Sequence, residues 1–213
     1  AARPLANDRD GCRRRGGHSG RPALSGQAGL GPLRPLIPNP GQLAAFGSGD
    51  LANRTLNQVE KIEIRLTGYL APDAQLMIKS TLAELAERYG GTGDETPVEP
   101  AQFDPPQGAF FVAYLGGEPV GCGGWRSHGA DGTVAEIKRM YTAPAVRGRG
   151  IARAVLTAVE DSARQHGRRR AILETGNRQP EAIGLYESHG YRRIPNFGFY
   201  RDHPGVLSLG RDL

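Results

Sequence analysis

The stretch Arg147-Gly148-Arg149-Gly150-Ile151-Ala152 is the most informative segment for the fold, because it joins a predicted strand to the clearest amphipathic helix in the sequence. Its two glycines permit the positive φ angles of a tight turn, so successive backbone N–H groups can point into one concavity. The first turn of the helix adds N–H groups without intrahelical acceptors and the positive end of its dipole. The stretch therefore predicts a site for a phosphate or pyrophosphate, with a glycine-rich turn that holds no ligand as the alternative.

Two familiar phosphate-binding motifs do not fit this spacing. A GxGxxG/A dinucleotide fingerprint beginning at Gly148 would require a small residue where Arg153 stands. The GxxxxGK[ST] loop is excluded because the sequence contains no Gly-Lys pair. The turn therefore matches neither motif.

Hydrophobic periodicity on both sides of the turn predicts alternating strands and helices. In the helix that follows the turn, Ile151, Val155 and Val159 share an apolar face, Glu160 lies on the polar face, and Gly167 ends the run. The other predicted elements are strands at 59–66, 110–115, from 119 onward, 133–141, 170–175, 191–201 and 206–211, and helices from 72 to the glycines at 90–91 and at 180–189. This order predicts an α/β (α+β) fold, a mixed sheet with helices on its faces and one right-handed parallel crossover.

Composition narrows the class of protein. The 213 residues are 38% hydrophobic and 23% charged, and no run approaches the about 18 apolar residues that cross a bilayer. The two cysteines, Cys12 and Cys122, are too few for a disulfide scaffold, and no CxxC or HxxxH pair indicates a metal. We therefore expect a cytoplasmic protein with no metal and no membrane partner, in which Cys122 is a small packing residue.

The net charge of +5 resides mainly in the first 50 residues, which carry seven arginines and three aspartates. That segment is rich in glycine and proline and shows no sustained period, so we expect a disordered leader over residues 1–55 and one domain over 56–213. The run Arg13-Arg14-Arg15 is compatible with an RNA-binding or targeting arm, but a solvated tail is the simpler interpretation. We therefore do not expect nucleic acid as a partner.

The turn and its surroundings resemble the GCN5-related N-acetyltransferase (GNAT) family. Residues 147–152 match the [RQ]xxGx[GA] signature of that family, and three further segments follow its pattern in the same order. These are Ala135-Glu136-Ile137-Lys138-Arg139-Met140-Tyr141, Ala182-Ile183-Gly184-Leu185-Tyr186-Glu187-Ser188-His189-Gly190-Tyr191, and Phe197-Gly198-Phe199-Tyr200-Arg201-Asp202-His203-Pro204. The resemblance covers about residues 59–211 and implies a mostly antiparallel twisted sheet of six to seven strands with a splayed parallel pair.

The resemblance also implies a site for acetyl-CoA between the two parallel strands, which would end near residues 141 and 175. Backbone groups of the strand end at Met140, Tyr141 and Thr142 would pair with the pantetheine arm. The N–H groups of Arg147, Gly148, Arg149, Gly150, Ile151 and Ala152 would hold the pyrophosphate. The family often has Asn seven residues before its tyrosine, whereas here Gln179 stands at that position and Asn177 lies two residues earlier, so both are candidates for a cofactor contact.

The resemblance gives one catalytic candidate, and the face of the strand at 133–141 gives a second. Tyr186 occupies the position of the family's tyrosine that protonates the departing sulfur, with a core aromatic as the alternative. Glu136 is the candidate base, and the alternative is an ion pair with Lys138, which we expect on the same strand face together with Met140. Glu174, on the neighbouring strand, is a poorer candidate for the base. These residues predict direct transfer of an acetyl group to a small-molecule or amino-acid-like amine, in a possible homodimer, with a non-catalytic acyl-CoA-binding module as the alternative.

Overall fold

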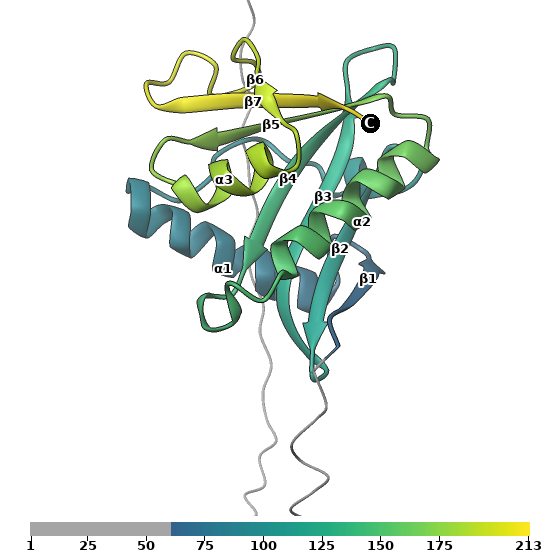
Figure 1. Cartoon of the computed structure of the whole chain (residues 1–213), viewed down its shortest axis with the longest axis vertical. Coiled ribbons are helices and arrows are strands. Elements are labelled where there is room, and N and C mark those ends of the chain that lie inside the picture. The colour runs from purple at the N-terminus through teal and green to yellow at the C-terminus, as the bar shows by residue number, and fades with distance from the viewer. Residues whose placement is uncertain (1–60) are drawn as a thin grey trace, which may run out of the picture. The chain divides into compact units, whose positions relative to one another are not determined.

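The computed structural model describes residues 61–213, so the leader predicted over 1–55 and the first residues of the predicted domain lie outside the described part of the chain. Strands and helices alternate nearly as the periodicity predicts (Figure 1). The elements are β1 (Glu63–Thr67), α1 (Pro72–Tyr89), β2 (Gly108–Leu115), β3 (Glu118–His128), β4 (Val134–Thr142), α2 (Ile151–Gln165), β5 (Arg170–Gly176), α3 (Pro180–Ser188), β6 (Arg192–Arg193) and β7 (Val206–Asp212), with 3₁₀ turns η1 (Pro100–Phe103) and η2 (Pro144–Val146).

Seven strands form one sheet in the order β1-β2-β3-β4-β5-β7-β6. All neighbouring strands are antiparallel except β4 and β5, which are parallel and connected through α2. Figure 1 shows β4 and β5 diverging toward their carboxyl ends, with α3 beside β5. The predicted α/β (α+β) class and the mixed, mostly antiparallel sheet with one parallel pair are confirmed.

Helices cover both faces of the sheet, as predicted. On one face, Met77 and Ile78 of α1 pack against Phe110 and Val112 of β2. The other face carries α2 and α3, and its buried cluster includes Trp125, Val155, Leu156, Val159, Leu173 and Tyr186. Each large apolar side chain buried in this way stabilises the domain by roughly 1.5–3 kcal/mol. These two clusters pack helices against both faces of the sheet, and β4 and β5 lie in the interior of its strand order.

The strand predicted over 191–201 is wrong beyond its first residues. Only Arg192–Arg193 pairs with β7, and the chain then continues as a loop. Pro195 has no backbone N–H to give to a ladder, and Gly198 adopts a left-handed φ of 74°. The side chain of Asn196 instead accepts a hydrogen bond from the N–H of Ser208 at 3.2 Å. The segment after Arg193 is therefore a loop rather than a strand.

Glu160 also departs from its predicted place on the exposed face of α2. Its side chain is buried, and Oε1 accepts a hydrogen bond from the Tyr191 hydroxyl at 2.9 Å. Arg164 and Arg211 lie 3.5 Å from its other oxygen. The carboxylate is tolerated in the interior because these neighbours replace water, and periodicity alone does not reveal such partners.

Candidate active site

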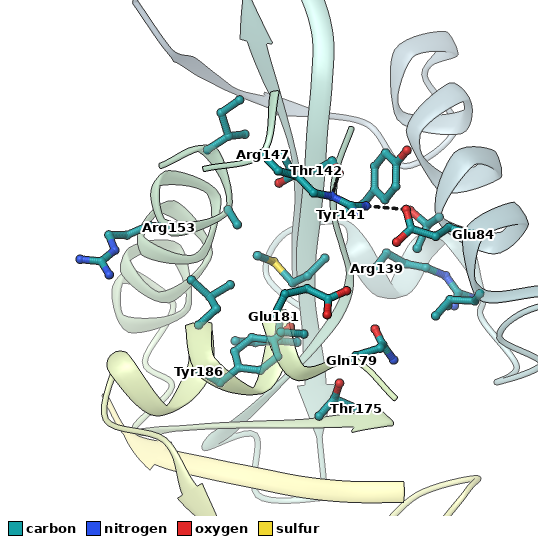
Figure 2. Close-up of a pocket in the computed structure, with 18 of the residues that line it drawn as sticks. Glu84, Arg139, Tyr141, Thr142, Arg147, Arg153, Thr175, Gln179, Glu181 and Tyr186 are labelled. Carbon is teal, nitrogen blue, oxygen red and sulfur yellow. Dashed lines mark hydrogen bonds and ion pairs between the residues drawn. The ribbon is translucent and has the colours of Figure 1, made fainter. Parts of the chain in front are cut away.

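The two parallel strands separate early in their course. Register pairs join Val134 to Arg170, Ala135 to Ala171 and Glu136 to Ile172, and no further pair joins β4 to β5 although both strands continue. A cavity of about 410 Å³ is lined by residues from the separated ends, from α1 and α3, and from the turn before α2 (Figure 2). The predicted splaying near residues 141 and 175 is confirmed.

A bulge in β4 sets which side chains reach this cavity. Gly124 pairs with Lys138 and Cys122 with Tyr141, so Arg139 and Met140 together oppose Gly123. Arg139 has a φ of 59°, in the left-handed region that non-glycine residues seldom adopt. The extra residue shifts by one position the alternation of β4 side chains between the two faces of the sheet.

The bulge makes one sequence prediction wrong. Met140 does not share a face with Glu136 and Lys138, because it packs on the α2 side of the sheet, within reach of the position of Gly123 and of Val155. Tyr141 instead faces the α1 side. Glu136 and Lys138 do share the α1 side, with Lys138 Nζ 3.3 Å from Glu136 Oε1.

The glycine-rich turn forms one end of the cavity. Gly148 and Gly150 have φ values of 79° and 85°, which only glycine adopts at little cost, and Gly150 is the N-cap of α2. No side chain caps the helix, so the first N–H groups of α2 lack intrahelical acceptors. Gly148, Gly150, Ile151 and Ala152 all line the cavity. These donors, with the positive end of the helix dipole, provide an environment suited to a diphosphate.

Arg147 connects this turn to the opposite wall. Its Nε donates to the carbonyl of Thr142 at 3.0 Å, and its guanidinium pairs with Glu84 of α1, as Figure 2 shows. Arg88, one turn further along α1, pairs with Glu181 of α3. Two ion pairs therefore link α1 to the turn and to α3 around the cavity.

Most of the residues predicted for the cofactor site come together in the structure. The lining includes Met140, Tyr141, Thr142, Arg147, Gly148, Gly150, Ile151, Ala152, Gln179 and Tyr186. Arg149 and Asn177 are not among the residues that line the cavity. The backbone N–H of Asn177 donates to Gly205, whereas Gln179 Nε2 lies 3.3 Å from the Tyr89 hydroxyl. Gln179 is thus the nearer of the two alternatives to the cavity.

Tyr186 extends from α3 into the space beside β4 (Figure 2). Its side chain is buried, and its ring contacts that of Tyr191 edge to face with centroids 5.7 Å apart. Burial raises the pKa of the Tyr186 phenol, so the group stays protonated across the ordinary pH range. Tyr186 therefore presents a neutral phenol at the cavity wall, and its role as proton donor stays a prediction.

Glu136 lies beneath the cavity rather than in its wall. Arg126 Nε donates to Oε2 at 2.8 Å, and Lys138 pairs with the other oxygen. Burial alone would raise the pKa of Glu136, but Lys138 and Arg126 outweigh it and lower the pKa. The ion pair weighed as the alternative for this residue is present, and its role as base stays a prediction.

The far end of the cavity carries charged residues that the sequence analysis did not single out as a group. Asp94, from the segment between α1 and β2, pairs with the buried Arg139. Glu174 of β5 lies beside Lys138, with Nζ and Oε2 separated by 3.6 Å. Glu84, Arg88 and Glu181 were missed as well. An i,i+4 spacing marks the pair of Glu84 with Arg88, but partners 63 or 93 residues away leave no local pattern.

Cys122 is fully buried, and its thiol lies 3.2 Å from the carbonyl of Arg139. Burial raises the pKa of this thiol to about 12, so it lacks the thiolate character of a nucleophile. Among residues 61–213, no three His, Cys, Asp or Glu side chains gather as a metal site would require. No described helix combines the length and apolar character needed to cross a bilayer.

A comparison with family models decides the assignment. The model described as the acetyltransferase (GNAT) family matches residues 79–191, more than half of the chain. The matched range includes β4, the glycine-rich turn, α2, β5 and α3. This chain belongs to the GNAT family. As a GNAT acetyltransferase it is an acyltransferase that uses acetyl-CoA, and the amide donors of its turn fit a diphosphate group.

Individual relatives and a solved structure are consistent with this family assignment for the GNAT chain. The IAA acetyltransferase of Azospirillum brasilense is 38% identical over 104 residues, which are 49% of this chain and 67% of the relative. The N-acetylaspartate synthetase of Rattus norvegicus is 37% identical over 120 residues, 56% of this chain and 40% of the relative. A solved GNAT family acetyltransferase from Elizabethkingia anophelis, with acetyl-CoA bound, shares the fold with a TM-score of 0.52 at 19% identity, covering 71% of this chain and 98% of that chain.

Proposed function

We propose that this GNAT chain transfers the acetyl group of acetyl-CoA directly to the amine of a small-molecule, amino-acid-like acceptor. The observation that carries the proposal is the parting of β4 and β5 after Glu136 and Ile172, next to a glycine turn that presents amides to the same cavity. A relative named for the synthesis of N-acetylaspartate supports an amino-acid-like acceptor.

In this proposal the chain's own residues divide the work. The amides from Arg147 to Ala152 bind the pyrophosphate, and backbone groups of Met140 and Thr142, free of β5, pair with the pantetheine amides. Acetyl-CoA, when bound, supplies an activated thioester. A backbone N–H at the end of β4 stabilises the negative charge that develops on its carbonyl oxygen. The buried Tyr186 phenol gives a proton to the departing sulfur.

The test is thiol release from acetyl-CoA in the presence of a panel of amines and amino acids. Turnover with at least one acceptor, and an acetylated amine identified by mass spectrometry, supports the proposal. Tight acetyl-CoA binding without turnover on any acceptor favours a non-catalytic acyl-CoA-binding module. A cytoplasmic location and a homodimer remain predictions from the sequence.

A further inference from the structure

The two edges of the sheet are built differently. At one edge, β6 is only two residues long, both residues are arginines, and Pro195 follows shortly after. Short edge strands, charged side chains and proline are common features of edges that do not pair with another chain. At the other edge, β1 pairs with β2 over five residues without a bulge and contains neither proline nor glycine. Within residues 61–213 no strand lies on the outer side of β1 (Figure 1), so its outward backbone groups are open to pairing.

The side chains of β1 alternate between a charged face and an apolar face. Glu63 and Arg65 lie opposite β2 residues of the buried cluster on the α1 side of the sheet. Ile64 and Leu66 lie opposite β2 residues of the cluster on the α2 side. Residues directly opposite each other on neighbouring strands share a face, so the two pairs of β1 residues lie on different faces. Leu66 is 62% exposed, and a further strand beside β1 would cover it.

The order of charges along β1 is self-complementary under two-fold symmetry. If a second copy lies antiparallel with the axis at Ile64, Glu63 of each copy lies opposite Arg65 of the other. On the other face the same register sets Ile62 opposite Leu66. An axis at Glu63 or at Arg65 would instead set like charges opposite each other, which is unfavourable. The register centred on Ile64 therefore pairs both charges of the strand with their opposites.

Arg65 is already held beside this edge. Its Nε and Nη2 donate to Glu63 at 2.8 and 2.6 Å, and its guanidinium lies 4.1 Å from the centre of the Tyr114 ring. The Tyr114 hydroxyl in turn donates to Asp73 of α1 at 2.7 Å. Pairing about Ile64 adds the glutamate of the second copy to each Arg65, so the two local pairs become one network of four charges. An isolated exposed ion pair contributes little, so these charges set the register while backbone hydrogen bonds and apolar contacts supply the attraction.

We propose that β1 is the interface of a homodimer, in which the β1 strands of two copies pair antiparallel about a two-fold axis at Ile64. The two seven-stranded sheets then continue into each other across the interface. Strands β2 and β3 separate β1 from β4, and the cavity lining contains no residue of β1, so the charges of β1 can be changed without touching the cavity. Dimer formation therefore does not depend on the proposed transfer reaction. Because only five residues of each copy pair, the interface is small and the dimer should dissociate on dilution.

The experiment measures the mass of the full chain in solution by sedimentation equilibrium, from low to high micromolar concentration. The wild type is compared with Arg65→Glu, Glu63→Arg, the double variant with both changes, and Arg193→Glu at the β6 edge as the control. Each single β1 variant turns two opposite-charge pairs into two like-charge pairs, so we expect dimerisation to be about 30-fold weaker. The double variant, and an equimolar mixture of the two single β1 variants, restore opposite charges and should dimerise like the wild type. Arg193→Glu should also dimerise like the wild type.

Three results would overturn the proposal: a wild-type chain that stays monomeric at high micromolar concentration, single β1 variants that dimerise as well as the wild type, or a mixture that dimerises no better than its components. Urea denaturation checks that each variant is folded, and the exposed Glu63 and Arg65 should tolerate the changes. If a β1 variant does not fold, amide hydrogen exchange of the wild type decides. The β1 amides should exchange more slowly as concentration rises while those of β6 do not change, and β1 exchange that is independent of concentration would contradict the interface.

Discussion

Glu136 of β4 and Ile172 of β5 form the last register pair between the two parallel strands. Past this pair, β4 runs on to Thr142 and β5 to Gly176 without pairing to each other, and residues from both separated ends line a cavity. Backbone N–H and C=O groups that are removed from water are nearly always hydrogen-bonded. This pair therefore marks where the pairing between β4 and β5 ends and where their facing edges become available to an extended ligand.

Adding a methyl group at Gly150 should weaken acetyl-CoA binding several-fold. A Cβ at this position meets nothing within 4 Å, so the cost is backbone strain at a φ of 85°, about 1–2 kcal/mol for an L residue. Relaxing that strain would turn the N–H groups away from the cavity. The control is Gly184→Ala in α3, where space is also open but φ is not positive. Calorimetric titration with acetyl-CoA should separate the two variants, and equal affinities would exclude the turn as the pyrophosphate site.

Tyr186→Phe should lower kcat by about 100-fold while acetyl-CoA affinity is kept, because only the proton donor is lost. Tyr191→Phe is the matched control, since its ring contacts Tyr186 but its hydroxyl bonds to Glu160. Removing that hydroxyl should lower the free energy of unfolding by about 1–3 kcal/mol and leave kcat unchanged. Steady-state kinetics and urea denaturation of both variants check this. Comparable kcat values for Tyr186→Phe and the wild type would refute the assignment.

Stability should depend on pH through Glu136. Its pKa is lowered in the folded state, so its contribution is present above the unfolded-state pKa of about 4.3 and is lost as pH falls through the folded-state value. Breaking this buried pair by Glu136→Gln should cost about 3 kcal/mol near neutral pH, and the difference from the wild type should shrink in acid. Urea denaturation at several pH values measures this. The exposed Glu63→Gln should show a small effect throughout, and a gap for Glu136→Gln that does not change with pH would contradict the ion pair.

Cys122 should resist alkylation in the folded chain. The thiol is buried and its pKa is raised to about 12, so almost no thiolate is exposed to the reagent. Iodoacetamide labelling followed by peptide mass spectrometry should find Cys122 unmodified under native conditions and fully modified in urea. Rapid native labelling at this position would show that the core around β3 opens readily.

Local patterns in the sequence were sufficient for the framework of the fold. The period of α2, the glycines at 148 and 150 and the order of strands predicted the sheet, the crossover and one end of the cavity. The local patterns failed where a contact with a residue distant in the sequence determines the burial or the direction of a side chain. Met140 changes face because Arg139 is bulged, Glu160 is buried because Tyr191 and Arg211 meet it, and the predicted strand at 191–201 ends at Arg193 before Pro195. No period of 2 or 3.6 residues encodes such contacts.

The residues of the candidate site also fall into a predictable group and an unpredictable one. The residues of the turn and the end of β4 follow one another along the chain, and a signature can capture them. Glu84, Asp94, Glu174 and Glu181 reach the cavity from four separate segments, and their roles depend on charges across the gap. Glu174 was the less favoured base from sequence alone. Only the three-dimensional arrangement shows that its oxygens lack hydrogen-bond partners, while those of Glu136 are taken.

The bulge at Arg139 and the loop around Gly198 have a joint consequence for how this enzyme could change its chemistry. In the proposed mechanism the thioester donor is bound mainly by one continuous stretch of chain, β4 through α2. The connecting segments near Asp94 and Gly198 reach the cavity through Asp94 itself and through Glu174, against which Gly198 packs. Connections tolerate replacement far better than strands do. Grafting new segments there offers a way to redirect the enzyme to other nucleophiles without rebuilding the half that handles the thioester.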